Sequence, residues 1–266
     1  MKNLYWLSIA FGLVVAGFFL ADRRFTEVGL IGALICAGLT LGLGFWWFKP
    51  RPMWQGILWG ALAQPVVFSL NNQMVGISNK LGITHLDAAL YSPLPEETIK
   101  LLGVVIIVAA FKNVRHPYQA AAIGMAIGLG FDAMENVPFI LHAAIDNLDG
   151  DLWGVIITGT GRFFVGAFSH ALYTGVAAWG VGKLYAGARH GYWQVAGFWL
   201  AGIALHTLFY GSTMIAGEWP ATILVIALIT WTLIFWGLRF MRKQDRKYAA
   251  QSSENVLSTK DPEYSS

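Results

Sequence analysis

Apolar runs close to the length that crosses a lipid bilayer recur along the whole chain. A spanning helix needs about 20 apolar residues. Eight such runs are present, at about 4–21, 27–48, 54–70, 95–111, 118–141, 163–182, 192–210 and 220–239. Only 12% of the residues are charged, against about 25% in a soluble domain. The sequence therefore predicts an all-α fold, a polytopic membrane bundle of about eight transmembrane helices.

The segments between these runs are too short to hold a soluble domain. Residues 1–240 are therefore expected to form one transmembrane domain, followed by a disordered cytoplasmic tail at 241–266. The single cysteine, Cys36, excludes a disulfide framework and a cysteine-based metal site. The apolar runs make the lipid bilayer the expected surroundings. Basic residues cluster only in loops and in the tail, so nucleic acid is not an expected partner.

The distribution of charge between the apolar runs indicates an orientation. Basic residues fall on one side if the N-terminus is inside, whereas an acidic loop around Asp149 falls on the other side. The basic loop residues are Lys49, Arg51, Lys112, Arg115, Lys183 and Arg189. The positive-inside rule thus predicts a multi-pass protein of the cell membrane with both termini in the cytosol.

Three ionisable residues stand at the mouth of the fourth run, where an apolar chain has no structural need for them. Glu96, Glu97 and Lys100 follow the turn sequence Ser-Pro-Leu-Pro at 92–95. With spacings of three and four residues, their side chains project from one helical face. Such a cluster is expected to line a polar cavity rather than to face lipid.

Three further runs carry polar side chains at membrane depth, again at helical spacing. The fifth run has Asp132, Glu135 and Asn136, the sixth has His170 and Thr174, and the seventh has His206 and Tyr210. Under the predicted orientation, the carboxylates and imidazoles of all four runs lie toward the outer leaflet. His170 is expected roughly 10 Å below the start of its helix at 1.5 Å per residue. Arg162, at the start of the sixth run, is expected to reach the lipid headgroups, with binding of a substrate carbonyl as the alternative.

The cost of these residues supports a shared site. An acidic side chain at the centre of a spanning helix costs about 2.5–3.5 kcal/mol. A common hydrated cavity would offset that cost, with Lys100 neutralising one carboxylate and imidazoles bonding to others. Paired glutamates and two histidines are also the groups needed to activate water, because a carboxylate in a low-dielectric cavity is a stronger base. Asn136 could orient a ligand or donate to an oxyanion.

The same side chains could also bind a metal ion. The chain has no His-Glu-x-x-His motif, so a divalent metal such as zinc would need ligands from different helices. Glu97, Glu135, His170 and His206 are the candidate ligands. The residues alone permit either a metal-activated or a glutamate-activated water.

The ordered motifs resemble the PrsW family of intramembrane proteases, which belongs with the CAAX prenyl proteases and bacteriocin-processing membrane enzymes. The motifs are Pro-Glu96-Glu97-Thr-Ile-Lys100, Gly-Phe-Asp132-Ala-Met-Glu135-Asn136, Ser-His170 and Leu-His206. The resemblance runs from about 54 to 212 and implies a catalytic core there. It also implies peptide-bond hydrolysis of membrane-anchored regulatory proteins such as anti-sigma factors.

By resemblance, the catalytic role falls on five residues and a supporting role on three. The catalytic residues are Glu96, Glu97, Glu135, His170 and His206, and the supporting ones are Lys100, Asp132 and Asn136. Two positions depart from the pattern: Asp132 stands where some members have Glu, and Tyr210 where CAAX relatives often place Asn or Asp.

Two other functions are compatible with buried carboxylates and histidines. A proton- or cation-coupled transporter would use them as a relay, although such transporters show internal repeats and a midplane site that this sequence lacks. A catalytically silent scaffold for membrane helices shares every feature except turnover. An activity assay distinguishes the intramembrane protease from both.

Overall fold

The computed structural model describes residues 1–21, 24–48, 53–82, 91–111, 114, 116–216 and 220–258. Within these ranges all regular structure is helical, which confirms the all-α fold class. The helices are α1 (Lys2–Ala21), α2 (Glu27–Phe48), α3 (Met53–Lys80), α5 (Pro93–Phe111), α6 (Pro117–Asp146), α7 (Asp151–Gly161), a π-helical turn η1 (Arg162–Gly166), α8 (Ser169–Tyr185), α9 (Gly191–Ala216) and α10 (Pro220–Ser258). Each predicted apolar run coincides with helix.

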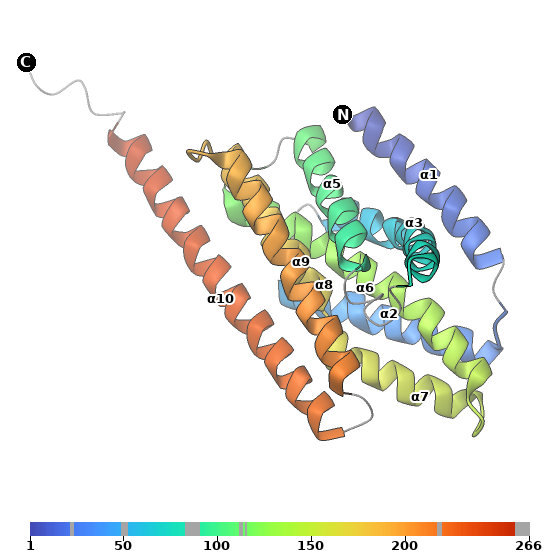
Figure 1. Ribbon diagram of the computed structural model, residues 1–266. Coiled ribbons are helices and arrows are strands. Elements are labelled where there is room, and N and C mark those ends of the chain that lie inside the picture. The colour runs from blue at the N-terminus through green and yellow to red at the C-terminus, as the bar shows by residue number, and fades with distance from the viewer. Residues whose placement is uncertain are drawn as a thin grey trace, which may run out of the picture.

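Helix α6 forms the centre of the bundle (Figure 1). It packs against α2, α3, α5, α7 and α8, while α1 lies on one flank against α3 and α5. On the opposite flank, α10 lies along α9 and η1. Small residues permit this density, because a Cβ on Gly128 or Gly124 would meet the backbone carbonyl of His170 or Thr174 in α8. The Gly124–Gly128 spacing thus brings two site-bearing helices into direct contact.

Five helical stretches of the described chain are long and apolar enough to cross a membrane. They are Lys2–Phe19, Glu27–Trp46, Asp151–Tyr185, Gly191–Thr213 and Leu224–Gln244. Helices α3, α5 and α6 are not among them, and these three helices carry most of the buried polar side chains. The chain is therefore a multi-pass membrane protein.

The sixth predicted run differs from the expected continuous helix. The segment predicted as an acidic loop contains α7, which leads into η1, and the chain then breaks at Phe168 before α8 begins. Phe168 has φ 68°, a left-handed conformation that bulky side chains rarely adopt. His170 consequently lies at the very start of α8 instead of two turns inside a helix, as the sequence predicted.

The C-terminal segment also differs from its prediction. Helix α10 continues to Ser258, past residue 241 where the disordered tail was expected to begin. Residues 241–258 contain neither Gly nor Pro, so nothing in them interrupts a helix started by the apolar run. The remaining residues of the tail, 259–266, lie outside the described part of the chain, as do Lys49, Arg51, Lys112 and Arg115.

Candidate active site

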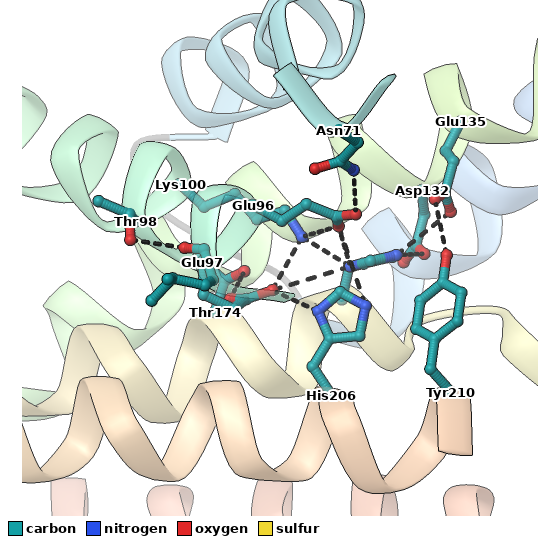
Figure 2. A network of polar contacts seen from close by, with 12 residues as sticks. Asn71, Glu96, Glu97, Thr98, Lys100, Asp132, Glu135, Thr174, His206 and Tyr210 are labelled. Carbon is teal, nitrogen blue, oxygen red and sulfur yellow. Dashed lines mark hydrogen bonds and ion pairs between the residues drawn. The ribbon is translucent and has the colours of Figure 1, made fainter. Parts of the chain in front are cut away.

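Five helices deliver polar side chains to one buried location. Helix α5 brings Glu96, Glu97 and Lys100, α6 brings Asp132, Glu135 and Asn136, and α8, α9 and α3 bring His170, His206 and Asn71. All eight residues predicted for the site are buried: Glu96, Glu97, Lys100, Asp132, Glu135, Asn136, His170 and His206. The structure therefore brings the whole predicted set together, and Figure 2 shows its members facing one another from several helices.

Local sequence explains where these side chains emerge. Prolines in the sequence Ser-Pro-Leu-Pro lie at the start of α5, where the missing N–H groups cost no helical hydrogen bond. Glu96 and Glu97 therefore follow at the first turn, and Lys100 lies one turn further on. In α8, the left-handed Phe168 ends the π-helical turn and starts a new helix, whose second residue is His170.

Lys100 is the centre of the first half of the site. Its Nζ donates to Glu97 Oε1 at 2.9 Å and to Glu96 Oε2 at 3.3 Å. Nζ also lies 2.6 Å from His170 Nδ1 and 3.8 Å from the centre of the Phe131 ring. An ammonium can only donate, so Nδ1 is the acceptor and His170 carries its proton on Nε2. The side chain of Lys100 is fully buried.

His206 completes this half from α9. Its Nδ1 donates to Glu97 Oε1 at 3.1 Å, and its ring stacks on Tyr173 with centroids 4.9 Å apart. The other ring nitrogen, Nε2, is buried without a hydrogen-bond partner among the described residues and lies 3.9 Å from Glu96 Oε2. Thr174 Oγ1 donates to the second oxygen of Glu97 at 3.1 Å, which fixes this carboxylate in orientation.

Glu135 organises the second half of the site. Its Oε2 accepts from His170 Nε2 at 3.2 Å and from Arg162 Nη2 at 2.5 Å. Its Oε1 accepts from the Tyr210 hydroxyl at 3.3 Å. Arg162 Nε reaches Asn136 Oδ1 as well, and its guanidinium lies 4.0 Å from the centre of the Phe139 ring. Figure 2 shows Glu135 and Tyr210 together, away from the Lys100 cluster.

A cavity of about 420 Å³ opens onto the Glu135 half. Asp132, Glu135, Arg162 and His170 are among its lining residues, together with apolar side chains of α6, η1 and α9. Asp132 Oδ2 is buried without a hydrogen-bond partner among the described residues. The cavity is thus lined by this unpaired carboxylate oxygen of Asp132, the Glu135–Arg162 ion pair, the His170 ring and apolar side chains. A mostly apolar lining with a few polar groups is typical of substrate sites.

The donor atoms fit a divalent metal ion. Glu96, Glu97, His170 and His206 each offer one ligand atom, and these atoms all lie within 4.8 Å of one another. Two carboxylates and two imidazoles are ligands that zinc accepts, and the unpartnered Nε2 of His206 supplies a free lone pair. Asp132 and Glu135 form a second such group with His170. The four candidate ligands predicted from sequence, which included Glu135, are thus divided between two groups that share His170.

Three residues of the network were not assigned to it from sequence. Asn71 of α3 donates from Nδ2 to Glu96 Oε1 at 3.2 Å, but its helix was expected to end near residue 70. Arg162 was expected to reach the headgroups, but it contacts Glu135, and only 25% of its side chain is exposed. Tyr210 was grouped with His206 by helical spacing, but it was assigned no role in the site. Its helical spacing from His206 was the available signal.

Comparison with known proteins adds one finding. A family model described as PrsW family intramembrane metalloprotease matches residues 49–238, which is more than half of the chain and includes every residue of the network. Neither the curated proteins nor the solved structures contain a match to this sequence.

Proposed function

We propose, because the chain belongs to the PrsW family of intramembrane metalloproteases, that it is an endopeptidase which cleaves membrane-anchored regulatory proteins. As a member of this family, the chain is a protease that acts on membrane proteins in a lipid bilayer. The finer assignment, an anti-sigma factor or a similar single-span regulator as substrate, is our proposal. The observation that carries it is the buried glutamate–histidine network that opens onto a cavity with apolar walls.

Glu135 is the proposed general base. It lines the cavity, and three donors hold its two oxygens in place. A water bound in the cavity gives a proton to this carboxylate while its oxygen attacks the peptide carbonyl. The proton then passes from Glu135 to the leaving amine nitrogen as the C–N bond breaks, which returns the carboxylate to its ionised form.

Arg162 and His170 support the same reaction from the cavity wall. Arg162 presents a guanidinium where negative charge develops on the carbonyl oxygen. His170 donates from Nε2 to Glu135 and thereby orients the carboxylate. On the other side of the imidazole, Lys100 donates to Nδ1, and Glu96 and Glu97 lie 3.9 Å from the same nitrogen. Glu96, Glu97, His170 and His206 would hold a divalent metal, which would supply an acidified water and polarise a carbonyl.

We place the site toward the outer leaflet of the cell membrane, with both termini in the cytosol. The support is the distribution of charge, because Lys183, in the last turn of α8, and Arg189, in the turn that follows, lie at the opposite end of α8 from His170. A substrate would then present its scissile bond near the extracytoplasmic end of its own helix.

Cleavage of a single-span reporter in proteoliposomes tests the proposal. We expect Glu135→Gln and Glu97→Gln each to lower the cleavage rate by about 100-fold or more, as loss of a general base or of its support does. Asp149→Asn, in the exposed loop after α6, is the matched control and should retain the wild-type rate. Thermal unfolding of each variant in detergent establishes that it is folded.

The outcome also separates the alternatives. Wild-type cleavage rates in both folded glutamine variants would contradict the proposed site. Substrate binding without cleavage by the wild type would support a scaffold instead. Solute flux that depends on a pH gradient and survives both substitutions would support a transporter.

A further inference from the structure

The ammonium of Lys100 lies among the atoms that would hold a metal. Three of the four candidate ligands are Glu96, Glu97 and His170, and Nζ lies within 3.3 Å of a side-chain oxygen or nitrogen of each. The fourth residue, His206, hydrogen-bonds the same Glu97 oxygen that Lys100 contacts. Lys100 therefore shares its contacts with a potential cation site and does not merely flank it.

The tautomers of both histidines direct a ring-nitrogen lone pair to this group, which Lys100 occupies in His170 and which is unpartnered among the described residues in His206. Because Lys100 donates to Nδ1 of His170, the proton of that ring lies on Nε2, where Glu135 accepts it. His206 donates from Nδ1 to a carboxylate, so its Nε2 is the nitrogen with a free lone pair. A histidine that ligates a metal through one nitrogen usually donates its other N–H to a carboxylate. His170 has this arrangement with Glu135, whereas the acceptor for His206 is Glu97, another member of the group.

We propose that the Lys100 ammonium and a divalent metal ion are mutually exclusive occupants of the group formed by Glu96, Glu97, His170 and His206. Lys100 then sets how tightly metal binds, because the ion must displace a side chain that already neutralises the carboxylates. Both cations together would place three positive charges against two carboxylates in a fully buried location, which is unfavourable. The inference concerns metal occupancy, and it rests on the family's metal chemistry rather than on cleavage of any substrate.

Metal binding to the purified full-length protein tests this. We expect Lys100→Met, which removes the charge but retains most of the side-chain volume, to bind Zn²⁺ at least about tenfold more tightly than the wild type. The affinity is measured by competition with a chromophoric chelator, and bound zinc is counted by elemental analysis. Co²⁺ substitution gives an absorption spectrum that reports its ligands without reference to activity.

Matched variants localise the effect. Lys80→Met, on the exposed end of α3, should bind Zn²⁺ as the wild type does. Lys100→Arg retains a cation and should gain nothing. Adding His206→Ala to Lys100→Met should abolish the gain if the ion binds in this group. Lys100→Gln is measured in parallel, because the glutamine amide can still donate to a carboxylate. This variant replaces Lys100→Met in the test if the methionine variant does not fold.

Two results would overturn the proposal. One is an affinity of both neutral Lys100 variants that equals or falls below the wild-type value, since Lys100 would then support the ion instead of excluding it. The other is a gain that persists after His206→Ala, because the additional zinc would then be bound elsewhere. Loss of proteolysis by Lys100→Met with tighter zinc binding would leave this inference intact, so the two proposals fail separately.

Discussion

His170 connects the two halves of the site through one ring. Its Nδ1 contacts Lys100, and its Nε2 contacts Glu135, so a single imidazole separates the fully buried cluster from the cavity. The left-handed Phe168 places this ring at the start of α8. A strained backbone position next to a reactive side chain is common at functional sites, where the surrounding structure over-determines the conformation.

Arg162 is expected to matter for both stability and catalysis. Arg162→Met would remove the charged hydrogen bonds to Glu135 and Asn136 and should destabilise the protein by about 1–3 kcal/mol. The cleavage rate should fall by about 100-fold, the order that loss of one oxyanion donor costs. Reporter cleavage and the thermal unfolding midpoint measure the two effects.

Two comparison variants separate charge from geometry at this position. Arg162→Lys keeps the charge but loses the simultaneous contact with Glu135 and Asn136, so its rate should lie between those of the wild type and the methionine variant. Arg189→Met, in the exposed turn before α9, should change neither rate nor midpoint. Wild-type cleavage by Arg162→Met would exclude an oxyanion role for this side chain.

Which side chains meet in the buried network was largely predictable from sequence because ionisable residues are costly in apolar helices. Glu97, Lys100 and His206 stand out for that reason alone, and helical spacing places each on a defined face. Arg162 was harder to assign, because an arginine near the end of an apolar run is also typical of a headgroup anchor. Asn71 is uncharged and lay beyond the predicted end of its run, so no comparable cost singled it out.

At the scale of elements, the predicted runs locate most of the helices, but neither α7 nor the interruption between α7 and α8. A π-helical turn has no clear sequence signature, and phenylalanine is among the residues least expected at positive φ. Burial of the Phe168 ring, which is 1% exposed, is a tertiary effect that overrides the local preference. The broken helix is nevertheless what lets η1 and the start of α8 line the same cavity.

The contact between α6 and α8 should be intolerant of added volume. At Gly128, a Cβ would meet the backbone carbonyl of His170, which cannot move aside without shifting α8. We expect Gly128→Ala to destabilise the protein by about 1–3 kcal/mol, the usual cost of overpacking. Cleavage should fall too, since α6 carries Glu135. Thermal unfolding in detergent and the reporter assay measure both.

Gly42 provides the matched control for this substitution. It lies within α2, and a Cβ there would meet nothing within 4 Å. Gly42→Ala should therefore be neutral, or stabilise by up to about 1 kcal/mol through the helix propensity of alanine. Equal midpoints for the two alanine variants would show that α6 and α8 are not in the close contact described here.

For the whole molecule, the alternation of helix direction determines where the polar residues meet. Helices α5 and α8 carry their site residues near their first turns, whereas α6 and α9 carry theirs in the middle or the second half. If successive spans run in opposite directions, this pattern brings all of them to one level. The loops at the two ends of these helices then lie on opposite sides of the membrane, so labelling the loops shows on which side the site lies.

Labelling of single cysteines by a membrane-impermeant maleimide measures that orientation. The only native cysteine, buried Cys36, is replaced by serine, and Asp149→Cys or Ala186→Cys is then introduced. Asp149 follows the end of α6 nearer to Glu135, whereas Ala186 lies at the end of α8 remote from His170. We expect intact cells to be labelled at position 149, and at position 186 only after permeabilisation. The reverse pattern would place the catalytic end of the bundle toward the cytosol and exclude cleavage at the extracytoplasmic end of a substrate helix.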